Sequence, residues 1–230
     1  MKHTKQIIGL LALTGAAIAP ATSFAYDKTS TDNKIGIYIT PKLLIGSTYM
    51  DTYAEGRGWA KSKALIATGG GSLAMGYDFS KRTRVPIRTE LEYATFTKAE
   101  LTSFTHQESY TLSNQVSTLF VNAYYKFKPD SWSSTYIGVG LGTATIKAEG
   151  SVNGSRSGNY YHGNASSNVS NFAYNIAFGS EMKINNSIAL DIGYRFADLG
   201  SVKRIGDSTF NFETKNLYQH QVSAGLRFTF

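Results

Sequence analysis

Apolar and polar residues alternate with a period of two along most of the chain after residue 25. In the C-terminal segment 218–230 every even-numbered residue except His220 is apolar, whereas the odd-numbered residues include Gln219 and Arg227. This period is expected of β-strands, because successive side chains of a strand point to opposite faces. The same alternation is found at 35–46, 66–79, 85–93, 118–127, 136–142, 172–182 and 187–196, less regularly in the first two. The sequence therefore predicts eight strands of about 10 to 14 residues each.

The connections between these strands alternate in length. Short turns are predicted at 80–84, 128–133 and 185–186, and long polar loops at 47–65, 98–113, 148–168 and 199–216. Short connections at one end and long ones at the other are typical of an up-and-down barrel in a bacterial outer membrane. An even number of strands then places both termini on the short-turn, periplasmic side.

The two faces of the predicted strands differ in charge. The apolar face of the six clearest strands carries no charged residue. A soluble barrel such as a lipocalin would have the reverse arrangement, with its apolar face inside. One charge on a lipid-facing midplane costs about 2–4 kcal/mol, and a sheet in lipid must close because its edges find no water. We therefore expect an all-β protein, an eight-stranded antiparallel up-and-down transmembrane β-barrel.

The polar face would line the interior of the barrel, its lumen, with balanced charge. Ten residues are expected there: Lys42, Asp78, Arg88, Glu90, Glu92, Lys126, Glu181, Asp191, Arg195 and Arg227. Eight strands leave an interior just wide enough for side chains, and unpaired charges in it would be costly. Two interpretations remain open, a plug of salt bridges and an ion pathway, and the plug is favoured.

The first 25 residues have the features of a secretory signal. Lys2 and Lys5 precede an apolar run at 7–19, and Ser23-Phe24-Ala25 supplies small residues at a cleavage site. The apolar run is shorter than the roughly 20 residues that a membrane-spanning helix needs. We expect a cleaved signal peptide at 1–25 and a barrel domain at 26–230.

Composition narrows the possible functions. The chain has no cysteine, so neither a disulfide framework nor a thiolate site can form. The formal net charge is +7, but two of the basic residues lie in the signal segment and no basic stripe follows. A nucleic-acid partner is therefore not expected, because its binding site would be a basic patch along one face.

Two segments near the C-terminus carry a family resemblance. The stretch 177–200, which includes Leu-Asp-Ile-Gly-Tyr-Arg-Phe at 190–196, and the ending Val-Ser-Ala-Gly-Leu-Arg-Phe-Thr-Phe at 222–230 resemble the small opacity-type outer-membrane proteins. The resemblance implies an eight-stranded barrel in the outer membrane of a Gram-negative bacterium. It also implies insertion by the outer-membrane assembly machinery, with Phe228 and Phe230 in the recognised signal. Adhesins and surface antigens share this pattern, so the fold alone says little about function.

Residues able to carry out catalysis are few. Some small outer-membrane barrels deacylate lipid A with a His and a Ser two positions apart on one strand face. Here His220 and Ser223 are three positions apart, so they would point to opposite faces of a strand. His106 and His162 fall in predicted loops without the spacing of a zinc site. No catalytic residue, metal site or cofactor is therefore expected.

The predicted long loops are the remaining candidates for binding. They combine large aromatic residues with Gly, Ser and Asn, a mixture that gives adaptable contacts. The contact candidates are Tyr53, Trp59, Tyr160 and Tyr161. The expected function is a non-enzymatic outer-membrane surface protein whose loops serve adhesion to a host or envelope ligand, or which stabilises the membrane. Outer-membrane lipid and lipopolysaccharide are its other expected partners. The alternatives are a narrow porin-like channel for small solutes and, less favoured, a lipid A-modifying enzyme.

Overall fold

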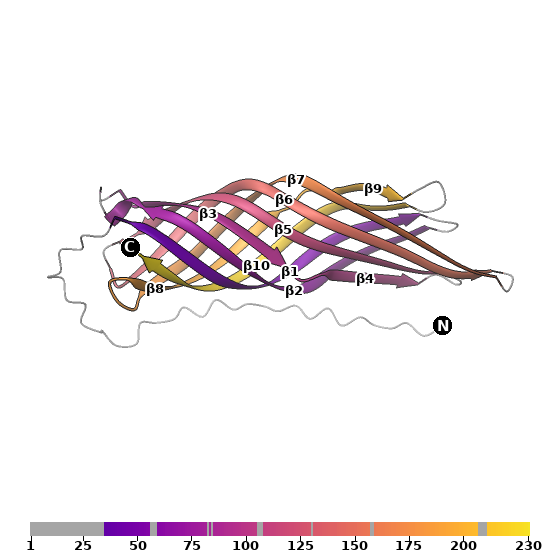
Figure 1. Cartoon of the computed structure of the whole chain (residues 1–230), viewed down its shortest axis with the longest axis horizontal. Coiled ribbons are helices and arrows are strands. Elements are labelled where there is room, and N and C mark those ends of the chain that lie inside the picture. The colour runs from indigo at the N-terminus through magenta and orange to yellow at the C-terminus, as the bar shows by residue number, and fades with distance from the viewer. Residues whose placement is uncertain are drawn as a thin grey trace. The chain divides into compact units, whose positions relative to one another are not determined.

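The computed structural model describes residues 35–55, 59–81, 83, 85–104, 108–129, 131–156, 159–206 and 211–230, and within them ten strands form one antiparallel sheet (Figure 1). The strands are β1 (Ile37–Glu55), β2 (Trp59–Asp78), β3 (Ile87–Phe96), β4 (Ala99–Phe104), β5 (Glu108–Phe127), β6 (Ser133–Arg156), β7 (Asn159–Lys183), β8 (Ile188–Asp198), β9 (Val202–Gly206) and β10 (Asn211–Thr229). No helix among these residues is long and apolar enough to cross a membrane. The expected signal peptide at 1–25 lies outside the described residues.

The sheet closes into a ring of eight strands. Its order is β1-β2-β3-β5-β6-β7-β8-β10, and β10 pairs with β1 from Tyr38↔Thr229 to Glu55↔Asn211. The short strands β4 and β9 continue β3 and β8 after brief interruptions, at 97–98 and 199–201. The prediction of an eight-stranded antiparallel up-and-down barrel is therefore confirmed.

The short connections gather at one end of the barrel (Figure 1). Their described parts are the one-turn helix η1 (Phe79–Lys81) before β3, residues 128–129 and 131–132 between β5 and β6, and the turn at 184–187. In the last of these, the Asn185 side-chain oxygen accepts hydrogen bonds from the backbone N–H groups of Ser187 and Ile188. β1 begins and β10 ends at this same end, as predicted.

The prediction of long loops at the opposite end is wrong. Most of 47–65, 98–113, 148–168 and 199–216 is strand. β6 and β7 have 24 and 25 residues and remain paired up to Arg156↔Asn159. These two strands are thus about twice as long as the hydrophobic alternation suggests. In the described parts of these four segments the barrel wall continues as hairpins. We call the strands at 47–65, 98–113, 148–168 and 199–216 the protruding strands.

β5 shows why the protruding strands were mistaken for loops. Its even-numbered residues are buried in the barrel from Tyr110 to Lys126. Its outward residues are apolar from Leu119 to Phe127 but are serine, threonine and glutamine from 109 to 117. An outward face without apolar residues does not indicate contact with lipid, although the backbone there pairs with its neighbours as it does from Leu119 to Phe127.

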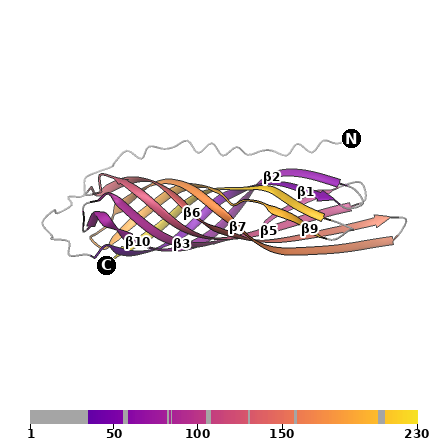
Figure 2. The same cartoon turned by 90° about the horizontal axis from the view of Figure 1, so that it is seen from above.

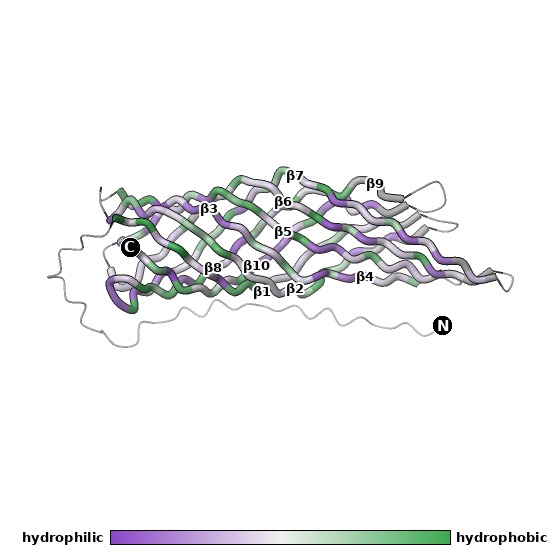
Figure 3. Tube along the Cα trace, in the orientation of Figure 1, coloured by the Kyte–Doolittle hydropathy of each residue, from purple (hydrophilic) through white to green (hydrophobic). Residues whose placement is uncertain are grey.

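The change on the outer face occurs at the same level on neighbouring strands. Thr95, Ser117, Thr145 and Ser170 are consecutive cross-strand partners on β3, β5, β6 and β7. Hydroxyl contacts join Ser117 to Thr95 at 3.3 Å and Thr145 to Ser170 at 3.2 Å. Most of the outward residues between this row and the short connections are apolar, and we call these apolar residues the apolar band. Figure 3 shows apolar residues concentrated in that half of the barrel. On β5 this apolar band runs from Leu119 to Phe127, nine residues, which is within the about 9–11 that span a bilayer.

The interior changes in the opposite sense. Along β10 the inward residues run from Arg227 through Gln221 and Gln219 to Leu217. The last of these residues, Leu217, belongs to a cluster of buried apolar residues, which we call the inner apolar cluster: Leu44, Met50, Ala94, Phe96, Ala99, Val116, Phe120, Ala144, Ile146, Ala148, Ala173, Ala197, Leu199, Val202 and Leu217. The protruding strands therefore resemble a soluble β-sheet protein, with apolar residues inside and polar residues outside.

Candidate functional site

The ten charged residues expected in the lumen are all buried, and each residue is at most 8% exposed. They come from seven strands and alternate with outward apolar residues, so the strand period places them inside. In the structure they separate into two clusters, which the sequence order does not show. The basal cluster lies toward the short connections and the central cluster lies farther along the lumen.

The basal cluster contains three cations and three carboxylates: Arg88, Lys126 and Arg227 with Asp78, Glu181 and Asp191. Lys126 Nζ lies 2.7 Å from Asp78 Oδ2 and 3.0 Å from Glu181 Oε2. Arg227 contacts Glu181 at 2.6 Å and Asp191 at 2.9 Å. Arg88 reaches the same Asp191 oxygen at 2.9 Å. The cluster is therefore neutral as a whole.

The central cluster contains two cations and two carboxylates. Lys42 Nζ lies 2.7 Å from both Glu90 Oε1 and Glu92 Oε2. Arg195 donates two hydrogen bonds of 2.8 Å to the two oxygens of Glu92. The hydroxyl of Tyr38 donates to Glu90 at 3.2 Å. This cluster is also neutral, and charge-assisted, bidentate pairs of this kind are the strong ones.

Buried polar side chains of β1, β2 and β10 lie beside the inner apolar cluster. Gln221 donates to Gln219 Oε1 at 2.8 Å, and Gln219 in turn reaches the hydroxyls of Thr48 and Thr68 at 3.3 and 3.4 Å. Along the described interior, buried side chains therefore change from ion pairs near the short connections to apolar groups farther away, with the two amides beside the apolar groups. Such an interior favours rigidity over passage of solutes.

The binding candidates of the protruding strands do not form one cluster. Tyr53 on β1 lies between two lysines, with Lys61 Nζ 4.8 Å and Lys215 Nζ 4.5 Å from its ring centroid. Tyr160 near the end of the β6–β7 hairpin is 89% exposed. The side chains of Trp59 and Tyr161 lie outside the described residues. Sequence reasoning missed the two lysines, because only strand pairing brings them to Tyr53. A hydrogen bond with the hydroxyl of Tyr53 raises the pKa of Lys61.

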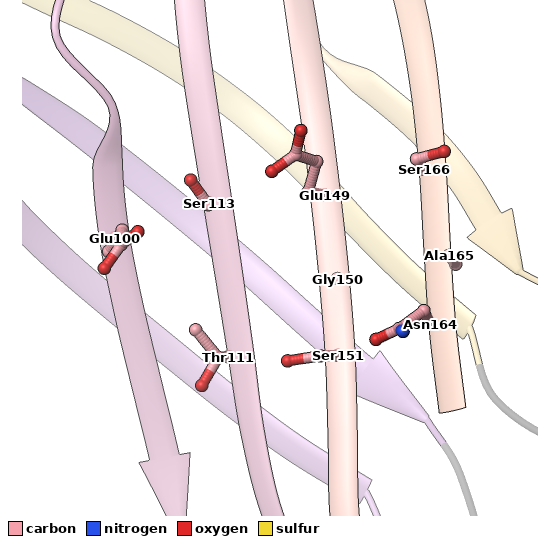
Figure 4. Close-up of a pocket in the computed structure, with 9 residues that line it drawn as sticks. All are labelled: Glu100, Thr111, Ser113, Glu149, Gly150, Ser151, Asn164, Ala165 and Ser166. Atoms are coloured by element: carbon pink, nitrogen blue, oxygen red, sulfur yellow. The ribbon is translucent and has the colours of Figure 1, made fainter. Parts of the chain in front are cut away.

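A shallow hollow of about 410 Å³ lies on the protruding strands β4 to β7 (Figure 4). Its lining is polar or small: Glu100, Thr111, Ser113, Glu149, Gly150, Ser151, Asn164, Ala165 and Ser166. An exposed ion pair joins Lys98 Nζ to Glu149 Oε2 at 2.8 Å, and this hydrogen bond raises the pKa of Lys98. Among the described residues no group of histidine and carboxylate side chains could hold a metal ion.

His220 and Ser223 do not form a catalytic pair. His220 is exposed on the outer face and its Nδ1 lies 2.7 Å from the hydroxyl of Tyr194. The Ser223 hydroxyl donates to the Gly193 carbonyl at 3.4 Å, on the inner face. The two residues thus lie on opposite faces of β10, as their spacing predicts.

The C-terminus is fixed into the wall of the barrel. The backbone N–H of Phe230 donates to the Ile37 carbonyl at 2.9 Å, and the Phe230 carbonyl accepts from Gly36 at 3.3 Å. Phe230 is 59% exposed, and Phe228 on the same face is partly buried. Both rings lie on the outer face at the end with the short connections.

The family model described as "Outer membrane protein beta-barrel domain" matches residues 8–230. The chain belongs to this family. It is accordingly a protein of the bacterial outer membrane, and the apolar band is the surface that faces lipid.

Two proteins and one solved structure are similar to this chain. The outer membrane protein PagN of Salmonella typhimurium is 30% identical over 187 residues, which cover 74% of this chain and 77% of PagN. A candidate adhesin of Rickettsia conorii, RC1281, is 24% identical over 153 residues, covering 62% of this chain and 61% of that protein. The crystal structure of the outer membrane protein OprG from Pseudomonas aeruginosa has a TM-score of 0.54 at 12% identity, covering 86% of this chain and 98% of OprG. This last likeness shows the fold alone.

Proposed function

We propose that the protein is a non-enzymatic surface protein whose protruding strands bind a partner outside the outer membrane, as an adhesin does. The length of the strands carries this proposal. A transmembrane strand needs about 9–11 residues, whereas β6 and β7 have 24 and 25. More than half of each is therefore not needed to cross lipid and is available for recognition.

The chemistry of the protruding surface supports binding to another macromolecule. Its outward residues on β5, β6 and β7 are mostly hydroxyl and amide side chains, with a few charges such as Lys147 and Glu149. These groups form hydrogen bonds without the apolar exposure that would make a surface aggregate. A rigid scaffold with an inner apolar cluster also loses little conformational entropy when it binds. The name of the relative RC1281 points to the same class of function.

The filled lumen weighs against the alternative of a narrow channel. Solute passage would require breaking neutral clusters of buried ion pairs and displacing the inner apolar cluster above them. Removing one partner of a buried pair costs about 3–5 kcal/mol, which few channels could supply during each passage. We therefore propose that the lumen charge network is a structural plug, with unit conductance at the noise level in planar bilayers.

We further propose that residues 1–25 direct export and that Phe228 and Phe230 form part of the signal read by the outer-membrane assembly machinery. The position of both rings on the outer face, at the end of the last strand, supports this role. Orientation follows from the short connections, which in this fold class face the periplasm. The protruding strands then extend outside the cell, through the lipopolysaccharide layer.

Adherence of bacteria that display the protein tests the proposed function. The register allows a clean deletion: Lys147 and Asn168 are cross-strand partners, so residues 148–167 can be replaced by an Asn-Gly turn. We expect this variant to insert normally and to lose adherence to epithelial cells. Asp51 and Lys63 are likewise partners, so a second variant that replaces 52–62 and removes Tyr53 shows whether the β1–β2 hairpin also contributes to adherence. If cells displaying the intact protein adhere no better than cells without it, the proposed function is wrong.

A further inference from the structure

The closed ring of strands divides into two sheets on the side of the apolar band that is farther from the short connections. Pairing between β2 and β3 ends at Gly70↔Phe96, and pairing between β7 and β8 ends at Tyr174↔Asp198. Beyond these points β4 pairs with β5, and β9 pairs with β10. The described protruding strands therefore form two separate sheets, β4-β5-β6-β7 and β9-β10-β1-β2.

Side chains and turns end the ladders at both points of division. Asn171 on β7 donates its Nδ2 hydrogens to the carbonyls of Leu199 and Ser201, at 3.0 and 2.8 Å. Between them Gly200 has a φ of +79°, a conformation that turns the chain away from β7. At the other division the Gly69 N–H donates to the Thr97 hydroxyl at 3.1 Å. β7 and β9 diverge beyond the division in both Figure 1 and Figure 2.

Two open sheets have four free edges, and three of them are protected. β4 and β9 are only six and five residues long. The free part of β2, from Trp59 to Gly69, carries Lys61 and Lys63. Short length and lysine are the devices by which natural proteins keep sheet edges from pairing with other chains.

The edge of β7 has none of these protections. The twelve residues from Asn159 to Ser170 include no Asp, Glu, Lys, Arg or Pro. They pair with β6 on one side. On the other side β9 approaches β7 without pairing with it, and no described strand pairs with residues 159–170 there. This segment is about 40 Å long at the usual rise of a strand, and half of its backbone N–H and C=O groups point to the open side.

We propose that the open edge of β7, residues 159–170, binds an extended peptide segment of a partner protein by adding it as a strand to the sheet. This inference rests on the proposed function and specifies its partner. The added strand would continue the ladder that β8 forms with the same edge of β7 from Tyr174 to Lys183. Main-chain hydrogen bonds supply the affinity in this mode, and alternate side chains supply the specificity.

The surroundings of the edge define the kind of segment that fits. Gly163, Ala165, Ser167 and Val169 face inward and are half-buried, so they leave room for larger apolar side chains of the added strand. The outward neighbours are Asn164, Ser166, Asn168 and Ser170, all exposed. Cross-strand neighbours of this type favour hydroxyl and amide partners. The fitting segment therefore alternates apolar residues with threonine, serine or asparagine and carries no net charge.

A second copy in the same membrane does not fit this edge. Strands of such barrels tilt by about 35–45°, so facing strands of two copies related by an axis along the membrane normal cross at about 70–90°. Strands crossing at that angle cannot form a ladder. A flexible peptide has no such restriction.

Binding to the purified full chain in lipid nanodiscs tests the proposal. The probe is a synthetic fluorescein-labelled peptide of alternating valine and threonine with a lysine at one end and a glutamate at the other, and its binding is followed by fluorescence anisotropy. Its control has the same side chains but methylated amide nitrogens, which cannot donate to a strand edge. We expect the methylated peptide to bind at least tenfold more weakly, and amide NMR shifts on binding of the first peptide to centre on 159–170. Equal binding of both peptides, or shifts elsewhere, would overturn the proposal.

Two variants at one level of the sheet separate the edge from the face. Asn164 on β7 and Ser151 on β6 are cross-strand partners with outward side chains. Asn164→Lys puts a charge at the open edge, whereas Ser151→Lys adds the same charge one strand away. We expect about a tenfold loss of peptide binding for the first variant alone. The reverse order, or cell–cell clumping that Asn164→Lys abolishes while the peptide does not bind, would refute peptide addition.

The same variants distinguish this inference from the proposed function. Adherence that is lost on replacing 148–167 but unchanged by Asn164→Lys would support the proposed surface function and refute peptide binding at the edge of β7. An adherence defect that follows Asn164→Lys and not Ser151→Lys supports both.

Discussion

Removing Glu92 from the central cluster offers a quantitative test of the charge plug. Glu92 is 1% exposed and contacts Lys42 at 2.7 Å and Arg195 at 2.8 Å. Two unit charges 2.8 Å apart attract by about 6 kcal/mol at an effective dielectric constant of about 20. Glu92→Gln removes this attraction twice and leaves two cations facing one carboxylate. We expect a loss of about 3–5 kcal/mol in the free energy of unfolding, the usual cost of breaking a buried pair.

The neutrality of the cluster makes a second, sharper prediction. Arg195→Gln alone leaves two carboxylates facing Lys42, so it should also cost several kcal/mol. The double variant Glu92→Gln/Arg195→Gln restores neutrality, and it should lose less than the sum of the single losses by about 0.5–3 kcal/mol, the range of coupling energies measured for contacting residues. The assay is reversible urea unfolding of the full chain in liposomes, followed by tryptophan fluorescence and by heat-dependent gel migration.

An exposed ion pair of the same length is the matched control. Lys98 and Glu149 also approach to 2.8 Å, but their side chains are 48% and 55% exposed. Because water screens such a pair, Glu149→Gln should cost less than about 1 kcal/mol. Equal losses for Glu92→Gln and Glu149→Gln, or strictly additive losses in the cycle, would refute the idea that the lumen is held by desolvated charge pairs.

Three further outcomes are expected. Val139→Arg in the middle of the apolar band should cost about 2–4 kcal/mol or block insertion, whereas Thr145→Arg above the band on the same strand face should cost little; equal effects on the gel would place the lipid boundary elsewhere. Trypsin added to intact cells should not cut after Lys147, because this residue lies in a paired strand rather than a loop; rapid cleavage there would contradict the protruding β6–β7 hairpin. Phe230→Ala should reduce the folded fraction in the outer membrane while the purified chain still refolds in detergent; unchanged assembly in cells would remove Phe230 from the assembly signal.

The sequence alone was sufficient for the strands that cross lipid. There the solvent outside and the packing inside make opposite demands, so most of these strands carry a clear alternation, as β5 does from Leu119 to Phe127. The same reasoning placed ten charges on one face and excluded a pairing of His220 with Ser223. It failed for 47–65, 98–113, 148–168 and 199–216, where the outer face meets water and becomes polar. Without a lipid-facing side, a strand rich in Ser, Thr and Asn has the composition of a loop.

Only the tertiary structure decided which charges meet and where the sheet opens. Arg195 binds Glu92 and Arg88 binds Asp191 across separations of 103 residues in both cases. Such contacts depend on the register with which eight strands close into a ring, a property of all the pairings together. The open edge of β7 has the same origin, because it exists only where β8 turns away at Gly200 and no neighbour takes its place. What the sequence determined was the environment of each side chain, since burial and lipid act residue by residue. What the structure decided was its partner, since partners are set by the geometry of closure.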